Sequence, residues 1–232
     1  MAKGIFVTGT GTDVGKTYVT GLIVRKLRRA GLNAGYYKAA ISGAEKGADG
    51  RLLPGDALYV KAAASLGEQT ERLVSYVYET AVSPHLAARI HGQPMDFACV
   101  KADFCWAAKK YDYLTMEGSG GIVCPLRWDE KEKVLLDDLV QQLGLSVLVV
   151  ADAGLGTINA IVLTIEHLQH RSIPVQGILL NRFHPGNVME EDNLRMAEAL
   201  TGVRVLAVVE ENAGELAMDA GALAGLYQDI QV

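Results

Sequence analysis

The chain has 232 residues, 50% of them hydrophobic and 21% charged, which is the composition of an ordinary globular protein. Its length favours a single domain over residues 1–232, large enough to bury roughly 70 to 75% of the surface that its unfolded chain exposes. A formal net charge of −5, with one basic cluster at the end of the first predicted helix, argues against nucleic acid and an anionic membrane as partners.

The first predicted elements enclose a glycine-rich loop. An apolar strand over residues 4–8 precedes Gly9-Thr10-Gly11-Thr12-Asp13-Val14-Gly15-Lys16-Thr17, and apolar residues at helical spacing predict a helix from about Lys16 to Arg29. Backbone N–H groups of such a loop bind phosphate oxygens, Lys16 reaches the β and γ phosphates, and the Thr17 hydroxyl binds Mg²⁺. The stretch therefore predicts a nucleoside triphosphate site.

This loop departs from the usual phosphate-binding pattern. Five residues rather than four separate Gly9 from the Gly15-Lys16 pair, and Thr10 stands where the pattern expects a glycine. The loop is therefore one residue longer than usual. A plain glycine turn with a solvated lysine is disfavoured, because Gly-Lys-Thr opens a helix directly after the first strand.

The rest of the chain alternates strands and helices around a glycine-rich loop over 40–50, which we expect to be long and mobile. We predict strands over 33–38, 73–78, 111–116, 145–150, 173–180 and 203–209, and helices over 56–66, from Ser83 onward, 96–110, 136–143, 158–170, 188–200 and 216–226. Strands that are apolar throughout are buried on both faces. The fold class is therefore α/β, with about seven mostly parallel strands and helices on both faces.

The cysteines and the first residues bear on location. Cys99, Cys105 and Cys124 are odd in number and lack metal-ligand spacing, so we expect neither a disulfide framework nor a zinc site. The start of the chain runs into the first strand without a secretory segment, and no apolar segment reaches the length of about 18 residues that a transmembrane helix needs. We therefore expect a cytoplasmic protein.

Candidate site residues follow from the fold class. Ligands of open parallel sheets bind beyond the carboxyl ends of the strands. The residues predicted there are the loop over 9–17, Lys38, Glu117-Gly118-Ser119-Gly120-Gly121, the segment 152–154, and Asn181-Arg182.

Two acidic residues are candidate metal ligands. A Glu117 carboxylate at the end of a strand could hold Mg²⁺ together with the Thr17 hydroxyl, because this hard ion prefers oxygen ligands. Asp56 is a weaker candidate, since an acid at the start of a helix also complements the helix dipole without binding an ion.

Lys38 and Asn181 each admit two interpretations. Lys38 is either a solvated charge at a strand end or a second cation beside Lys16, which we expect on the adjacent strand; two cations suggest a second anion, either a substrate carboxylate or one formed during the reaction. Asn181 either contacts a purine edge or ends a strand in a turn. His167 and His170 are interpreted as solvated, without a metal role, and Trp106, Trp128 and the methionines as packing residues.

Taken together, these segments resemble the dethiobiotin synthetases of biotin biosynthesis, a family of P-loop NTPases. The resemblance rests on the longer phosphate loop, Tyr37-Lys38 followed by Ser42-Gly43, Gly55-Asp56-Ala57, Ser83-Pro84-His85, Glu117-Gly118-Ser119-Gly120-Gly121, Leu155-Gly156-Thr157-Ile158-Asn159, and Asn181. They span most of the chain in the family's order.

The resemblance implies an ATP- and Mg²⁺-dependent ligase acting on 7,8-diaminononanoate. CO₂ is captured on one amine as a carbamate, ATP phosphorylates the carbamate to a carbamic-phosphoric mixed anhydride, and the second amine closes the ureido ring of dethiobiotin. The resemblance also implies a homodimer, in which the loop ending at Asn159 reaches the neighbour's substrate through a helix N-terminus.

The resemblance assigns four sets of residues. As catalytic residues it implies Lys16, Lys38, Thr12 and Ser42, and as Mg²⁺ ligands Thr17, Asp56 and Glu117. As nucleotide-binding residues it implies Gly11, Thr12, Asp13, Val14, Gly15, Lys16, Thr17, Tyr18, Asp56, Glu117, Gly118, Ser119, Gly120, Asn181, Arg182, Val208, Val209 and Glu210. As substrate-binding residues it implies Thr12, Lys38, Ser42, Gly120, Gly121 and Asn159 of the neighbouring subunit.

Two departures from the family leave the nucleotide preference open. Asp13 is one methylene shorter than the family's common Glu, and the segment from Val208 to Glu211 lacks the proline often found where the adenine binds.

Two other functions fit less well. An ATP-gated switch of the ParA/MinD kind carries a lysine where this chain has Gly11. A synthetase resembling cobyrinate diamide synthase carries an additional glutamine-hydrolysing domain with a nucleophilic cysteine, for which this chain has neither the length nor a suitable site.

Overall fold

The computed structural model describes residues 2–230. The strands are β1 (Lys3–Gly9), β2 (Ala34–Ser42), β3 (Glu45–Lys46), β4 (Leu52–Leu53), β5 (Val74–Tyr78), β6 (Tyr113–Gly121), β7 (Pro125–Trp128), β8 (Lys133–Leu135), β9 (Val147–Asp152), β10 (Val175–Asn181), β11 (Val205–Val209) and β12 (Gln228–Asp229). The helices are α1 (Lys16–Arg29), α2 (Gly55–Ala63), α3 (Pro84–Ile90), α4 (Phe97–Lys110), α5 (Leu136–Gln142), α6 (Thr157–His170), α7 (Val188–Thr201) and α8 (Ala220–Ala224), with a short 3-10 helix over Thr70–Arg72.

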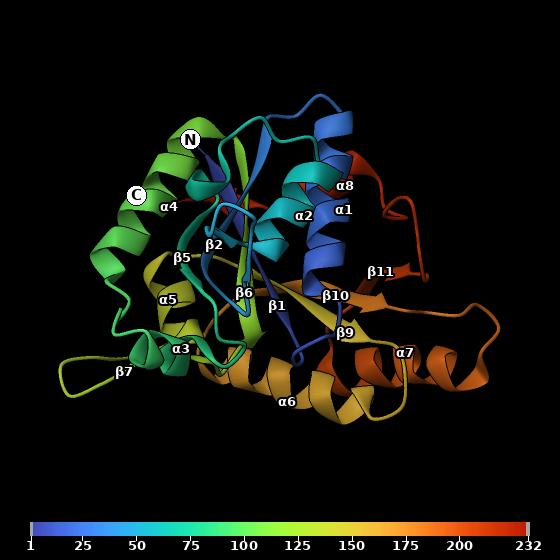
Figure 1. The fold of residues 1–232 in the computed structure, drawn as a ribbon. Helices are drawn as coiled ribbons and strands as arrows, with labels where there is room; N and C mark the ends of the chain where they lie inside the picture. The colour runs from blue at the N-terminus through green and yellow to red at the C-terminus, as the bar shows by residue number, and fades with distance from the viewer. Residues whose placement is uncertain (1, 231–232) are drawn as a thin grey trace.

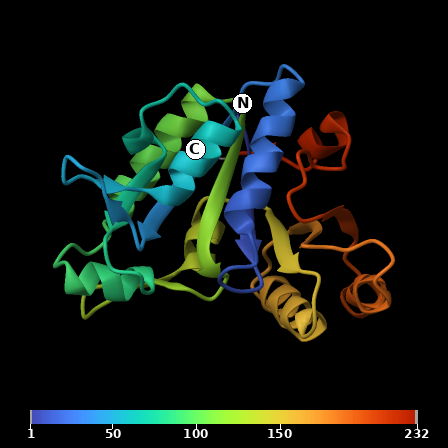
Figure 2. The same cartoon turned by 45° about the vertical axis from the view of Figure 1, so that its right-hand side comes forward.

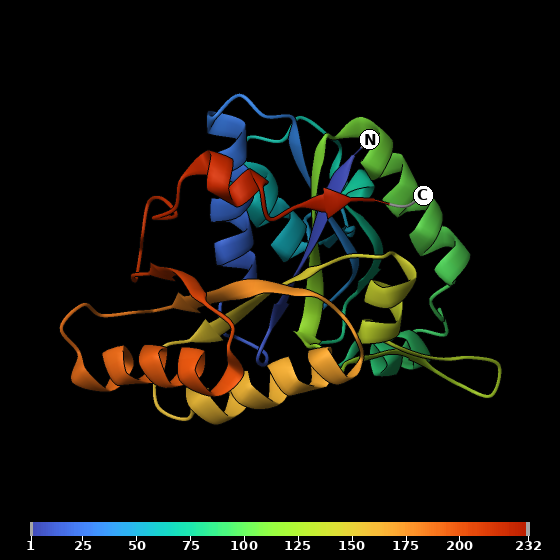
Figure 3. The ribbon, with the colours of Figure 1, turned by 180° about the vertical axis from the view of Figure 1, so that it is seen from behind.

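One central sheet organises the fold (Figure 1). Its strands run in the order β11-β10-β9-β1-β6-β2-β5, and all neighbours in this series pair in parallel. Figure 2 shows β1 and β6 side by side in the middle of the molecule. The strand β12 pairs antiparallel with the start of β1, where it appears red in Figure 3. The prediction of an α/β fold with about seven mostly parallel strands is confirmed.

Helices cover both faces of the sheet because its strands bury side chains on both sides. Ile5 and Val7 of β1 pack in an apolar cluster with α1, α2 and α8, while Phe6 points to a second cluster with helices α3 to α7. The helices α6 and α7 lie side by side along one edge of the molecule (Figure 1). Among residues 2–230, none of the helices is long and apolar enough to pass through a membrane.

Two strands run further than the sequence predicts. β2 continues to Ser42, and β6 continues through the glycines to Gly121. Gly118 lies within β6 and does not break the strand. A Cβ at this position would come 2.7 Å from the Phe6 ring, so glycine permits close packing there. Lys38 and Glu117 therefore lie inside their strands, not at the ends where they were predicted.

Other differences concern short elements with weak local signals. The segment 40–50, predicted as one loop, contributes the end of β2 and the hairpin strand β3, which pairs with β4. The hairpin of β7 and β8 was not predicted and projects from the body of the molecule (Figures 1 and 3). The helix predicted over 216–226 is only Ala220–Ala224, and β12 was not predicted.

Two predictions about side chains were wrong. His167 is not simply solvated, because its Nε2 lies 2.7 Å from Oδ2 of the fully buried Asp137. Trp128 was predicted to be a packing residue but is 52% exposed, and the Lys133 ammonium lies 5.3 Å from its ring centroid. Both side chains meet partners from other positions in the chain, which helical or apolar periodicity does not reveal.

Candidate active site

The phosphate loop joins the end of β1 to the start of α1. Gly15 precedes α1 with φ of 89°, and no side chain caps the helix, so the N–H groups of its first turn have no side-chain acceptor. A Cβ on Gly15 would overlap the side-chain amide of Asn181, which donates from Nδ2 to the Val14 carbonyl at 3.0 Å. Asn181, at the end of β10, thus fixes the backbone of the loop.

Lys16 lies folded over this loop. Its ammonium donates to the Gly11 carbonyl at 2.7 Å, and the side chain is buried. Burial lowers the pKa of Lys16, and the nearby Lys38 ammonium lowers it further. Lys16 and Lys38 line the same cavity. The prediction that β1 and β2 are adjacent strands was wrong, because β6 lies between them.

Lys38 sits between two carboxylates. Its Nζ lies 2.6 Å from Asp56 Oδ2 and 2.7 Å from Glu117 Oε1, and the sheet register places Lys38 directly beside Glu117. Burial alone would lower the pKa of Lys38, but Glu117 and Asp56 outweigh it and raise that pKa. Burial would raise the pKa of Asp56, but Lys38 lowers it. Lys38 therefore stays an ammonium and Asp56 a carboxylate.

The same carboxylates form an oxygen-rich corner with Thr17. The Thr17 hydroxyl donates to Glu117 Oε1 at 2.7 Å, which leaves its own lone pairs free, and the Tyr36 hydroxyl donates to Glu117 Oε2 at 3.1 Å. In the described part of the chain, no group of three or more His, Cys, Asp or Glu side chains is placed to hold a metal. Two carboxylates and a hydroxyl fit a hard ion whose other ligands come from phosphate and water.

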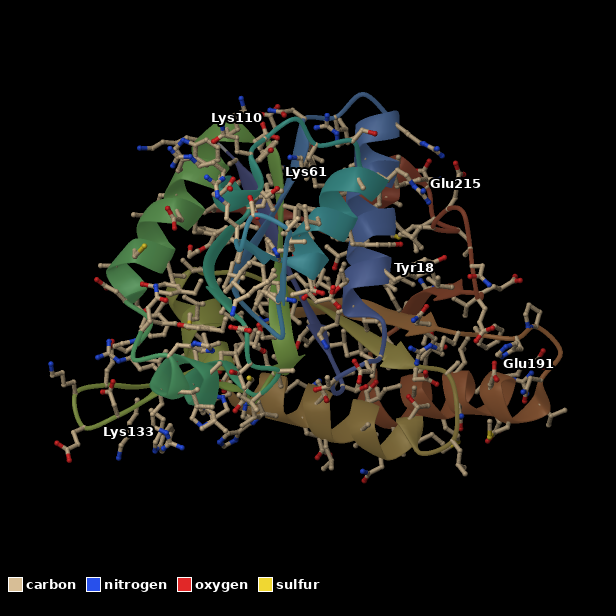
Figure 4. The ribbon with its side chains drawn as sticks, viewed as in Figure 1. Tyr18, Lys61, Lys110, Lys133, Glu191 and Glu215 are labelled. Carbon is tan, nitrogen blue, oxygen red and sulfur yellow. The ribbon has the colours of Figure 1, made fainter. Side chains whose placement is uncertain are left out.

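Three neighbouring cavities surround this corner. The first, of about 580 Å³, is lined by Thr12, Asp13, Gly15, Lys16, Thr17, Lys38, Ala40, Ile41, Ser42, Asp56, Glu117, Ser119, Gly120 and Arg182. The second, of about 710 Å³, shares Thr12, Ser42 and Gly120 with the first and extends to Gly121 and a more apolar wall. The third, of about 290 Å³, shares Gly15 and Arg182 with the first and adds Asn181, Glu210 and Tyr18 of α1, which is labelled in Figure 4.

Six predicted site residues lie outside the lining of these cavities: Gly11, Val14, Gly118, Val208, Val209 and Asn159. Val209 is buried in the apolar cluster that contains α1, and Val208 packs against the cluster on the opposite face of the sheet, so of the segment 208–210 only Glu210 lines a cavity. Asn159 is exposed near the start of α6 and lies outside the lining of all three cavities.

Sequence reasoning missed several lining residues. Glu211 and Asn212 line the third cavity, and their only signal was the break after the last predicted strand. The apolar wall of the second cavity comes from the segments 81–84 and 123–125, which carried no local motif for a ligand apart from Ser83-Pro84. Asp152 pairs with Arg182 at 2.6 Å, a contact between two predicted strand ends.

Comparisons with known proteins find a family model and relatives over most of the chain. The family model described as an AAA domain matches residues 3–215. The ATP-dependent dethiobiotin synthetase of Brachyspira hyodysenteriae is 46% identical over 228 residues, covering 98% of this chain and 100% of the relative. The one from Clostridium botulinum strain Loch Maree is 48% identical over 195 residues, covering 84% and 85%.

Solved structures with the same fold are distant in sequence. A ParA family ATPase from Chlorobium tepidum superposes with a TM-score of 0.53 at 10% identity, covering 90% of this chain and 85% of that one. The MinC:MinD cell division protein complex of Aquifex aeolicus gives 0.53 at 14% identity, covering 97% and 93%. These structures show the fold alone, whereas the full-length relatives show that the chain belongs to the dethiobiotin synthetase family of P-loop proteins.

Proposed function

We propose that this chain is an ATP-dependent dethiobiotin synthetase that closes the ureido ring of dethiobiotin from 7,8-diaminononanoate and CO₂. The observation that carries the proposal is the second buried cation, Lys38, facing the same cavity as the phosphate-loop Lys16. Nucleotide binding and hydrolysis alone need only the phosphate-loop lysine. A second lysine beside it suits a reaction in which another anion meets the γ-phosphate.

The reaction proceeds in three balanced steps. A neutral amine of the diamine attacks CO₂ and loses a proton, which gives a carbamate. A carbamate oxygen attacks the γ-phosphorus of ATP and ADP leaves, which gives a carbamic-phosphoric mixed anhydride. The second amine attacks the carbonyl carbon, phosphate departs, and the ring closes with loss of a proton.

Lys16 and Lys38 serve two of these steps with one arrangement of charge. An alkyl amine has a pKa of about 10, so keeping it neutral at pH 7 costs about 4 kcal/mol. Two ammonium groups nearby disfavour a third and favour the carbamate anion that replaces it. The Thr12 and Ser42 side chains line both the first and the second cavity, where they would orient the diamine.

Thr17, Asp56 and Glu117 would hold Mg²⁺, which supplies charge neutralisation at the phosphates when bound. The Thr17 hydroxyl donates its proton to Glu117, so the oxygen would offer a lone pair to the ion. The phosphate loop, Gly118 to Gly120 and Arg182 would bind the phosphates. Tyr18, Asn181 and Glu210, which line the third cavity, would surround the base.

We further propose a homodimer with the substrate site at its interface. Apolar side chains are exposed at the starts of the neighbouring helices α6 and α7: Leu155 is 92% and Val188 82% exposed. A second copy covering this surface would bring Asn159 and the start of α6 to the neighbour's diamine, together with Gly120 and Gly121 of that neighbour. Leu155→Asp is expected to weaken dimerisation in sedimentation experiments; an unchanged dimer would exclude this surface.

The direct test measures ATP hydrolysis with and without diaminononanoate and bicarbonate, with detection of the cyclic urea by mass. We expect hydrolysis that depends on the diamine and a product of dethiobiotin mass. Hydrolysis indifferent to the diamine would instead favour an ATP-gated switch, which the absence of a lysine at Gly11 already disfavours. A cytoplasmic location stays a prediction from the sequence.

A further inference from the structure

Arg182 and Asp152 join three segments that are distant in sequence. Arg182, just after β10, donates from one guanidinium nitrogen to Asp152 Oδ2 at 2.6 Å and from the other to the Asp13 carbonyl at 2.8 Å. Asp152, at the end of β9, accepts with its other oxygen from the Gly154 N–H at 2.8 Å. One ion pair thus links the phosphate loop to the loop that opens α6.

The phosphate-loop end of this bridge holds an unusual backbone conformation. Asp13 has φ of 62°, a left-handed conformation that costs a non-glycine residue free energy unless its surroundings support it. The Asp13 carbonyl accepts the hydrogen bond that the Arg182 guanidinium donates. The Arg182 side chain also lines both the first and the third cavity, between the predicted phosphate and base sites.

The α6 end is anchored from two sides. The buried Asn193 of α7 donates from Nδ2 to the carbonyls of Ala153 at 2.9 Å and Gly154 at 3.1 Å, while Asp152 holds the Gly154 N–H. Gly156, which precedes α6, has φ of 89° and provides no side-chain cap. The position of the first turn of α6 therefore depends on these hydrogen bonds.

We propose that Asp152 and Arg182 are positioning residues that hold the phosphate loop and the loop before α6 in one arrangement, so that nucleotide affinity and diamine affinity depend on the same bridge. The effect on diamine affinity rests on the proposed function, in which the start of α6 contacts the neighbour's substrate. The effect on nucleotide affinity does not depend on it. The bridge then connects the nucleotide site of one subunit to the diamine site of its partner.

The alternative is that Asp152 and Arg182 form an ordinary surface ion pair without a positioning role. The two side chains are 45% and 36% exposed, and exposed pairs contribute little to stability. Removing such a pair would leave ligand affinity unchanged, whereas removing a positioning pair would weaken it. The readouts are the dissociation constant of a non-hydrolysable ATP analogue, measured by titration calorimetry on the full chain, and the KM for the diamine.

We expect Asp152→Asn to raise both the analogue's dissociation constant and the diamine KM by about three- to tenfold, with kcat changed less than about twofold. Asp152→Glu, which keeps the charge, should recover part of both. The matched control is Glu132→Gln, which removes an Arg127 to carboxylate contact of 2.8 Å on the β7–β8 hairpin and should change neither.

Unchanged nucleotide affinity in Asp152→Asn overturns the proposal, whatever the substrate of the enzyme. A changed nucleotide affinity with an unchanged diamine KM also overturns it, because the two loops would then be independent. If the wild type forms no cyclic urea, the proposed function fails, while the nucleotide measurement still decides whether the bridge positions the phosphate loop.

Discussion

Replacing Lys38 by methionine removes the cation that holds Asp56 and Glu117 together. The Lys38 and Glu117 side chains are 5% and 0% exposed, so the substitution leaves a buried carboxylate without its counter-charge. Removing one partner of a buried ion pair costs about 3 to 5 kcal/mol. For a domain of this size we expect the melting temperature in metal-free buffer to fall by about 6 to 20 °C.

Added Mg²⁺ gives the sharper readout. In the wild type, the Lys38 ammonium already neutralises the two carboxylates, whereas in Lys38→Met the ion would take its place. Mg²⁺ should therefore raise the melting temperature of Lys38→Met more than that of the wild type. The control is Lys46→Met, which breaks an exposed pair with Glu79 and should cost less than about 1 kcal/mol with no added response to Mg²⁺.

The same variant tests catalysis. Lys38→Met, like Lys38→Ala or Lys38→Gln, should lose about two to three orders of magnitude in turnover while an ATP analogue still binds, because a preorganised cation at the reacting anion is lost. If Lys38→Met had the melting temperature of the wild type and the same response to Mg²⁺, Lys38 would not be the counter-charge of Asp56 and Glu117. Near-normal turnover would show that Lys38 takes no part in the reaction.

Two further variants test the loop and a pH-dependent contact. Gly15 has φ of 89°, and a Cβ there would overlap Asn181. Gly15→Ala should therefore abolish detectable nucleotide binding in titration calorimetry while the protein stays folded. Retained affinity would contradict the close contact between Gly15 and Asn181. A hydrogen bond to Glu190 raises the pKa of His184 above its ordinary 6.5, so the stability from this pair is complete below that value and is lost as the pH rises through the folded pKa. The gap in unfolding free energy between wild type and His184→Gln should therefore shrink between about pH 5.5 and about pH 9, and a constant gap would exclude this contact as its source.

Local patterns predicted the elements with strong signals. The bounds of α1 at Lys16 and Arg29 follow from its apolar spacing and from the Gly-Lys-Thr start, and the structure confirms them. Gly118 and Gly120 had the opposite effect, because glycine in a sequence indicates a break in a strand. In β6, Gly118 instead makes room for Phe6 of the neighbouring strand, a requirement visible only once both strands are placed.

Long-range partners could not be predicted from local patterns. The sequence suggested that Lys38 and Lys16 share a site, but not that β6 lies between their strands and places Glu117 beside Lys38. The pair of His167 with Asp137 joins positions on two different helices. Strand order and helix packing set such contacts, and no spacing within one element encodes them.

The transfer of oxygen from CO₂ to phosphate tests the central claim most directly. With ¹⁸O-labelled CO₂, ATP and diaminononanoate in a rapid-quench experiment, a carbamate oxygen that attacks the γ-phosphorus stays with the phosphate when the ring closes. We predict one ¹⁸O atom in each phosphate released with the cyclic urea, detected by mass. Unlabelled phosphate, formed by attack of water on ATP, would contradict the proposal that this site phosphorylates a carbamate beside Lys16 and Lys38.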